Sequence, residues 1–126
     1  MQRLKSETIR RWLVAFAWMA LIFWLSAQPR LPGPPDPFWR FVFMKTAHFG
    51  AYGTLAVLYL WALGKQRRGW ALGLALLYGL SDELHQSLVP GRTATLRDVV
   101  VDCCGAATAL FVYPYLFPLI ARKAQN

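Results

Sequence analysis

Four apolar blocks, each long enough to cross a lipid bilayer, constrain this chain more than any other feature of its sequence. They run over about residues 12–27, 41–63, 69–89 and 98–120, and hydrophobic residues make up 56% of the 126-residue chain. A membrane-spanning helix needs about 20 largely apolar residues to cross about 30 Å of hydrocarbon. We therefore predict an all-α integral membrane bundle of four transmembrane helices, formed by a single domain over residues 1–126.

The first block follows basic residues, as the apolar region of a signal peptide does. The segment after it, LSAQPR at residues 25–30, lacks the small residue expected three positions before a cleavage site. Three further apolar blocks follow. We therefore expect the first block to be retained as a membrane helix.

The basic residues are distributed unevenly between the two predicted sides of the membrane. Nine of the fourteen fall on the side that holds both termini and the short loop between the second and third blocks. These nine are Arg3, Lys5, Arg10, Arg11, Lys65, Arg67, Arg68, Arg122 and Lys123. Because loops rich in Lys and Arg stay in the cytoplasm, we predict that both termini are cytoplasmic. The net charge of +8 thus has a topological explanation, and without a nucleic-acid-binding motif we expect no nucleic-acid partner.

Polar and ionisable residues gather at the opposite, outer end of the later blocks. In the second block Lys45, His48 and Tyr52 are spaced i, i+3, i+7, which places them on one face of a helix. The third block contributes acids, a histidine and a glutamine near its outer end. The loop that follows it contributes an arginine, and the fourth block contributes two acids that lie one turn apart. These residues are Asp82, Glu83, His85, Gln86, Arg92, Asp98 and Asp102. An ionisable group at membrane depth costs about 2.5–3.5 kcal/mol, so such groups persist where they pair or act.

Helix dipoles suggest which of these charges pair. Lys45 lies near the positive end of its helix, and Asp82 and Glu83 lie near the negative end of theirs. Both placements become favourable if the two ends lie side by side, so we expect Lys45 to pair with an acid of the third block. Asp98 either joins the cluster or serves as a helix N-cap.

The cluster has two interpretations. A network of ion pairs could simply clamp the helices together, although such pairs often contribute little net stability. Alternatively, the cluster forms a pocket that opens toward the proline-rich outer loop, QPRLPGPPDPFWR. A pocket with two histidines, acids and basic groups suits proton transfer or recognition of an anionic head group.

The sequence gives little reason to expect a metal ion or a cofactor, and we predict neither. Cys103 and Cys104 are adjacent, which disfavours a disulfide between them and matches no metal-binding spacing. A metal-activated water is conceivable from two histidines and several acids, but these lie on three different blocks without a recognised spacing.

Two segments, KTAHFGAYGTLAVLYLWAL at 45–63 and SDELHQSLVPGRTATLRDVVVDCCGA at 81–106, resemble the VanZ-like family of small bacterial membrane proteins. The resemblance covers about residues 10–120, and its motifs are specific in combination. The matching positions are Lys45, His48, Phe49, Tyr52, Glu83, Gln86, Pro90, Gly91, Arg92, Asp98, Asp102 and Gly105. The chain departs from the family pattern at Asp102, where Asn is frequent, and at Ala109, where a second glycine often stands.

The resemblance implies a multi-pass protein of the bacterial cytoplasmic (inner) membrane. The family's founding member is associated with resistance to teicoplanin, a glycopeptide antibiotic that acts on cell-wall precursors at the outer membrane face. No reaction follows from the resemblance, so an enzyme and a binding protein both stay open.

We expect the pocket to engage the head group of a membrane lipid or a lipid-linked cell-wall precursor. The candidates for proton transfer or catalysis are His48, Glu83, His85 and Asp102. The candidates for ligand binding are Lys45, Tyr52, Asp82, Gln86, Arg92 and Asp98. The alternative is a non-catalytic structural protein whose polar cluster only clamps the bundle. A transporter is disfavoured because the charges cluster on one side only, and the sequence does not indicate an oligomeric state.

Overall fold

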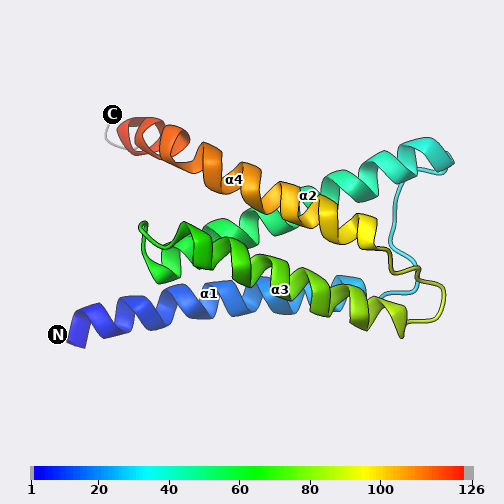
Figure 1. Ribbon diagram of the computed structural model, residues 1–126, viewed down its shortest axis with the longest axis horizontal. Helices are drawn as coiled ribbons and strands as arrows, with labels where there is room; N and C mark the ends of the chain where they lie inside the picture. Colours follow the sequence, from blue (N-terminus) through cyan, green and yellow to red (C-terminus); the bar gives the residue numbers. More distant parts are fainter. Residues whose placement is uncertain (1, 124–126) are drawn as a thin grey trace.

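Four helices and no strand make up the part of the chain that the computed structural model describes, residues 2–123, with side chains over residues 5–118 (Figure 1). The helices are α1 (Gln2–Ser26), α2 (Pro37–Leu63), α3 (Arg68–Ser87) and α4 (Leu96–Lys123). The predicted all-α architecture is confirmed. Each helix coincides with one of the four apolar blocks, but α1 begins well before its block because the polar residues ahead of the block are also helical.

Local sequence signals explain where α2 begins and ends. The side chain of Asp36 caps the helix by accepting a hydrogen bond from the Trp39 backbone N–H at 3.0 Å. Pro37 follows in the first helical position, where the N–H that proline lacks would have no partner within the helix. At the other end, Gly64 adopts φ +102°, which side-chain-bearing residues rarely tolerate. Its N–H binds the Leu60 carbonyl and closes the last turn.

The two longer loops lie at one end of the bundle. Figure 1 shows the α1–α2 and α3–α4 connections together at that end, whereas the start of α1, the α2–α3 turn and the end of α4 lie at the other. This arrangement agrees with the grouping of loops that the sequence predicts. Asp36, the α2 N-cap, and Gly91, which turns the chain after α3 with φ +83°, both belong to the end with the longer loops.

The closest helix contact is between α2 and α4, and small residues make it possible. A Cβ added to Gly105 would lie 2.2 Å from the carbonyl oxygen of Phe49, and one added to Gly53 would lie 3.1 Å from the Gly105 oxygen. Ala109 continues this face, 3.3 Å from the same added Cβ on Gly53. Close backbone approach through glycine and alanine is a typical way to pack helices in a membrane. It brings the first turns of α4 against α2, where the polar residues lie.

The surface of the bundle is rich in apolar side chains. Leu13, Trp24, Leu84 and Phe111 are each at least 60% exposed, and many other large apolar residues are exposed as well. By length and hydropathy, two helices of the described range could cross a membrane, Lys5–Ser26 within α1 and Leu96–Pro118 within α4. Water disfavours so large an apolar surface, whereas lipid does not. The spanning of α2 and α3 stays a prediction.

Candidate functional site

Three side chains on one face of α2 each reach an acid on a neighbouring helix. Lys45 forms an ion pair with Asp98 of α4. One turn further on, His48 Nδ1 lies 2.9 Å from an oxygen of Asp102, also on α4. The Tyr52 hydroxyl donates a hydrogen bond of 3.0 Å to Asp82 of α3. The predicted i, i+3, i+7 face of α2 therefore points into the bundle and links α2 to both α3 and α4.

The expected partner of Lys45 was wrong. Lys45 pairs with Asp98 rather than with an acid of α3, because the glycine contact between α2 and α4 brings the first turn of α4 closer. The N-cap interpretation of Asp98 is also wrong. α4 begins at Leu96, and Thr95 provides the cap, its hydroxyl accepting from the Asp98 backbone N–H at 3.3 Å.

A second chain of hydrogen bonds runs from α3 toward the loop after it. The Gln86 amide nitrogen donates to Asp82 at 3.2 Å and, more weakly, to the Ser26 hydroxyl at 3.4 Å. The Gln86 oxygen accepts from the guanidinium of Arg92 at 3.1 Å. Because Gln86 is only 2% exposed, these bonds fix its amide orientation and position Arg92. Ser26, at the end of α1, is a member of this network that the sequence did not single out.

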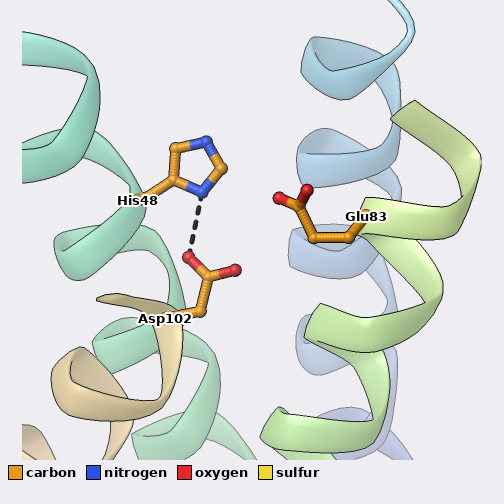
Figure 2. Close-up of side chains that lie close together, drawn as sticks. All are labelled: His48, Glu83 and Asp102. Carbon is orange, nitrogen blue, oxygen red and sulfur yellow. Dashed lines mark hydrogen bonds and ion pairs between the residues drawn. The ribbon is translucent and has the colours of Figure 1, made fainter. Parts of the chain in front are cut away.

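Glu83 lies on the side of α3 that faces α4. One of its carboxylate oxygens accepts a hydrogen bond of 2.9 Å from the Thr95 backbone N–H, which ties the α3–α4 loop to α3. Its other oxygen, Oε1, is buried without a hydrogen-bond partner among the described residues, and the same is true of Asp102 Oδ2. Figure 2 shows the side chains of His48, Glu83 and Asp102 converging from three helices. One potential ligand atom from each lies within 4.8 Å of the others.

A cavity of about 540 Å³ opens beside this cluster, between the two longer loops and the ends of α2 and α3. Its charged lining is mostly basic, with Arg30, Arg40, Lys45 and Arg92 against the single acid Asp98. The other lining residues are Pro29, Leu31, Met44, His48, Gln86, Gly91 and Thr93. A smaller cavity of about 80 Å³ shares His48 and Arg92 with it and continues toward Tyr52 and Asp82.

Comparison with known proteins gives one result. A model of the VanZ/LLP1 family matches residues 7–118. The chain belongs to the VanZ/LLP1 family. No curated protein and no solved structure matches the chain significantly. Membership in this family and the two long apolar helices together indicate a membrane protein.

The VanZ/LLP1 match includes every residue that the sequence predicted for the site. The structure brings all of them except His85 to the lining of the two cavities or to the group of His48, Glu83 and Asp102. His85 lies on another side of α3, where its ring stacks on Phe23 of α1 with centroids 4.2 Å apart. It lines neither cavity. The sequence placed His85 with the other polar residues near the outer end of the third block, but it did not show that α1 would cover His85.

The basic cavity of this VanZ/LLP1 protein includes two arginines that the sequence-based prediction of the site did not include. Arg30 comes from the α1–α2 loop, and Arg40 from the first turn of α2. The Arg40 guanidinium donates to the Leu31 carbonyl at 2.7 Å, which holds the proline-rich loop over the cavity. A signal was present, since both arginines lie between the first two apolar blocks, on the same predicted side of the membrane as Lys45 and Arg92.

Proposed function

We propose that this VanZ/LLP1 protein is a multi-pass protein of the bacterial cytoplasmic membrane, with four spans and both termini in the cytoplasm. The positive-inside rule supports this topology, because nine of the fourteen basic residues belong to the start of α1, the α2–α3 turn and the end of α4. Under this topology, the two longer loops and the basic cavity face the outside of the cell. Polar residues of α2, α3 and α4 then lie near the outer membrane surface.

The basic cavity receives the phosphate-bearing head group of an envelope lipid or a lipid-linked cell-wall precursor. The observation that carries this proposal is that three cavity arginines, Arg30, Arg40 and Arg92, form no ion pair with any described residue. Lys45 and Asp98 neutralise each other, so the three guanidiniums give the cavity an excess of positive charge. Guanidinium groups match phosphate oxygens in geometry and charge and can bind them through two parallel hydrogen bonds.

The surroundings of the cavity favour a lipid over a soluble anion. A volume of about 540 Å³ suits a head group, and the exposed apolar surfaces of the helices suit the attached hydrocarbon chain. Recognition of a lipid-linked precursor would also connect the protein with glycopeptide resistance, which is associated with the family. In this proposal Lys45, Asp98, Tyr52, Asp82 and Gln86 shape and orient the binding groups.

A chemical step, if the protein performs one, falls to His48, Glu83 and Asp102. His48 lines both cavities and contacts Asp102, so it is the group best placed to exchange a proton with a bound head group. His85 has a different environment, and its assignment to catalysis stays a prediction.

Binding of a polyprenyl phosphate tests the proposal against a closely matched neutral ligand, the corresponding polyprenol. We expect the purified protein to bind the phosphate and not the alcohol. Arg92→Gln should weaken binding by about tenfold or more, since a hydrogen bond to a charged group contributes about 1.5–3 kcal/mol. Arg67→Gln, at the other end of the bundle, is the matched control. Equal binding of the phosphate and the alcohol would contradict the proposal.

The second candidate function is a purely structural one, in which the polar cluster clamps the helices. The continuous bonding from Tyr52 through Asp82 and Gln86 to Arg92 favours it. This function predicts that Gln86→Ala lowers the amount of folded protein in the membrane and leaves ligand binding per folded molecule unchanged. Head-group recognition predicts weaker binding per folded molecule, because Gln86 positions Arg92.

A further inference from the structure

The cluster of His48, Glu83 and Asp102 has a feature that head-group recognition does not require. Two buried carboxylates, only 6% and 2% exposed for Glu83 and Asp102, come together beneath the basic cavity. Each has one oxygen bound within the protein and one buried oxygen, Oε1 and Oδ2 respectively, without a hydrogen-bond partner among the described residues. A buried, unpaired carboxylate oxygen is costly, so one expects such oxygens to have a partner.

Neither acid has a lysine or arginine as an ion-pair partner among the described residues. Lys45 forms its ion pair with Asp98. Among the described residues, Asp102 is paired only with His48. The side chains of Glu83 and Asp102 point toward each other and toward the His48 ring in Figure 2. Their ligand atoms and one ring nitrogen of His48 lie within 4.8 Å of one another.

We propose that His48, Glu83 and Asp102 bind a divalent transition-metal ion of the Zn²⁺ type. One imidazole nitrogen and two carboxylate oxygens are ligands that Zn²⁺ accepts, and three protein ligands with an open fourth position are the usual pattern of a reactive zinc site. Ligand atoms bound to one Zn²⁺ stand roughly 3.3 Å apart for bonds of about 2.0 Å, so the three side chains must close slightly around the ion. The flexible Glu83 side chain can supply that movement.

The metal site and the basic cavity share His48. An ion held there lies at the edge of the cavity that Arg30, Arg40 and Arg92 line, and its open coordination position is available to a phosphate oxygen. The site depends on three helices, which explains why no ligand spacing is visible in the sequence. It departs from the sequence-based expectation of no metal. The inference does not rest on the lipid proposal, because the three ligand side chains define it.

Zinc binding by the purified full chain, stripped with a chelator and carrying no polyhistidine tag, tests this inference. We expect one Zn²⁺ per chain by elemental mass spectrometry after removal of unbound metal. Glu83→Gln and Asp102→Asn should each weaken binding by at least about tenfold, because each removes a charged ligand. Glu7→Gln and Asp36→Asn make the same chemical changes outside the site and should bind as the wild type does.

Two further measurements keep the test decisive. Zn²⁺ should still bind when both cysteines are replaced, in Cys103→Ser with Cys104→Ser, because the thiols are outside the proposed site. In that background Zn²⁺ should raise the unfolding temperature and the chelator should reverse the rise, which needs no site variant to fold. The inference is overturned if the wild type retains no Zn²⁺, if the Glu83 and Asp102 variants retain as much, or if retention depends on the cysteines.

The same measurements separate this inference from the proposed function. Arg92→Gln should keep its Zn²⁺ while losing affinity for the polyprenyl phosphate. Metal binding without lipid binding would overturn only the proposed function. Lipid binding without metal binding would overturn only the metal site.

Discussion

Gly105 of α4 lies so close to Phe49 of α2 that a Cβ on Gly105 would stand 2.2 Å from the Phe49 carbonyl oxygen. This approach occurs one turn from Asp102 and next to His48, and it sets the distance at which these two residues meet. The polar cluster therefore depends on a glycine that carries no functional group.

Gly105→Ala should destabilise the protein by about 1–3 kcal/mol, because the added methyl group collides with backbone atoms that cannot rotate away. Denaturant unfolding in detergent measures the change. Gly50→Ala is the control on the facing helix, since its added Cβ meets no described atom within 4 Å. It should leave stability unchanged or raise it by up to about 1 kcal/mol. Equal effects of the two substitutions would show that the close crossing is not formed.

The ion pair between Lys45 and Asp98 should show strong energetic coupling. Removing either partner leaves a poorly solvated charge, so the double variant Lys45→Met with Asp98→Asn should be less destabilised than the sum of the single variants. We expect a coupling energy of about 1 kcal/mol or more from a double-mutant cycle. The exposed pair of Arg11 and Glu7 offers a comparison, with an expected coupling below about 0.5 kcal/mol. Additive effects at Lys45 and Asp98 would indicate that they do not pair.

Tyr52→Phe should cost about 1–2 kcal/mol in unfolding free energy. It removes the hydroxyl that donates to Asp82, an acid that is only 3% exposed and already has one unpaired oxygen among the described residues. Tyr115→Phe makes the same change at a site that is 65% exposed and should be neutral. A neutral Tyr52→Phe would argue that the hydrogen bond from Gln86 alone satisfies that oxygen of Asp82.

Alanine substitutions at two glycines with positive φ can distinguish a loss of stability from a loss of ligand binding. Gly64 (φ +102°) turns the chain between α2 and α3, and Gly91 (φ +83°) lies next to Arg92 at the cavity. Alanine at either position should cost about 1–3 kcal/mol, because side-chain-bearing residues disfavour a positive φ. Only Gly91→Ala should also weaken polyprenyl phosphate binding, since it displaces Arg92. Equal loss of binding in both variants would mean that binding follows overall stability.

The sequence predicts some parts of this site well for a simple physical reason. Lys45, His48 and Tyr52 recur at helical spacing, so once the segment is a helix they must share a face. The cost of ionisable groups in an apolar block likewise marks the acids of α3 and α4 as members of a cluster. These inferences need only the periodicity of one helix.

Partner choice between helices needs information that the periodicity of one helix does not contain. Lys45 meets Asp98 rather than an acid of α3 because of the crossing at Gly105, which depends on two helices at once. His85 illustrates the same limit within α3. At about 100° per residue, His85 and Gln86 lie on opposite sides of Asp82. His85 therefore stacks on Phe23 of α1, whereas Gln86 is bonded to Asp82, Ser26 and Arg92.

Native mass spectrometry of the protein released from bacterial membranes in mild detergent tests the central claim most directly. We predict that the wild type retains an anionic, phosphate-bearing lipid, that Arg92→Gln loses it, and that Arg67→Gln keeps it. The retained mass would also identify the head group. A wild-type protein that carries no such lipid, or an Arg92→Gln protein that carries as much as the wild type, would contradict recognition by the basic cavity.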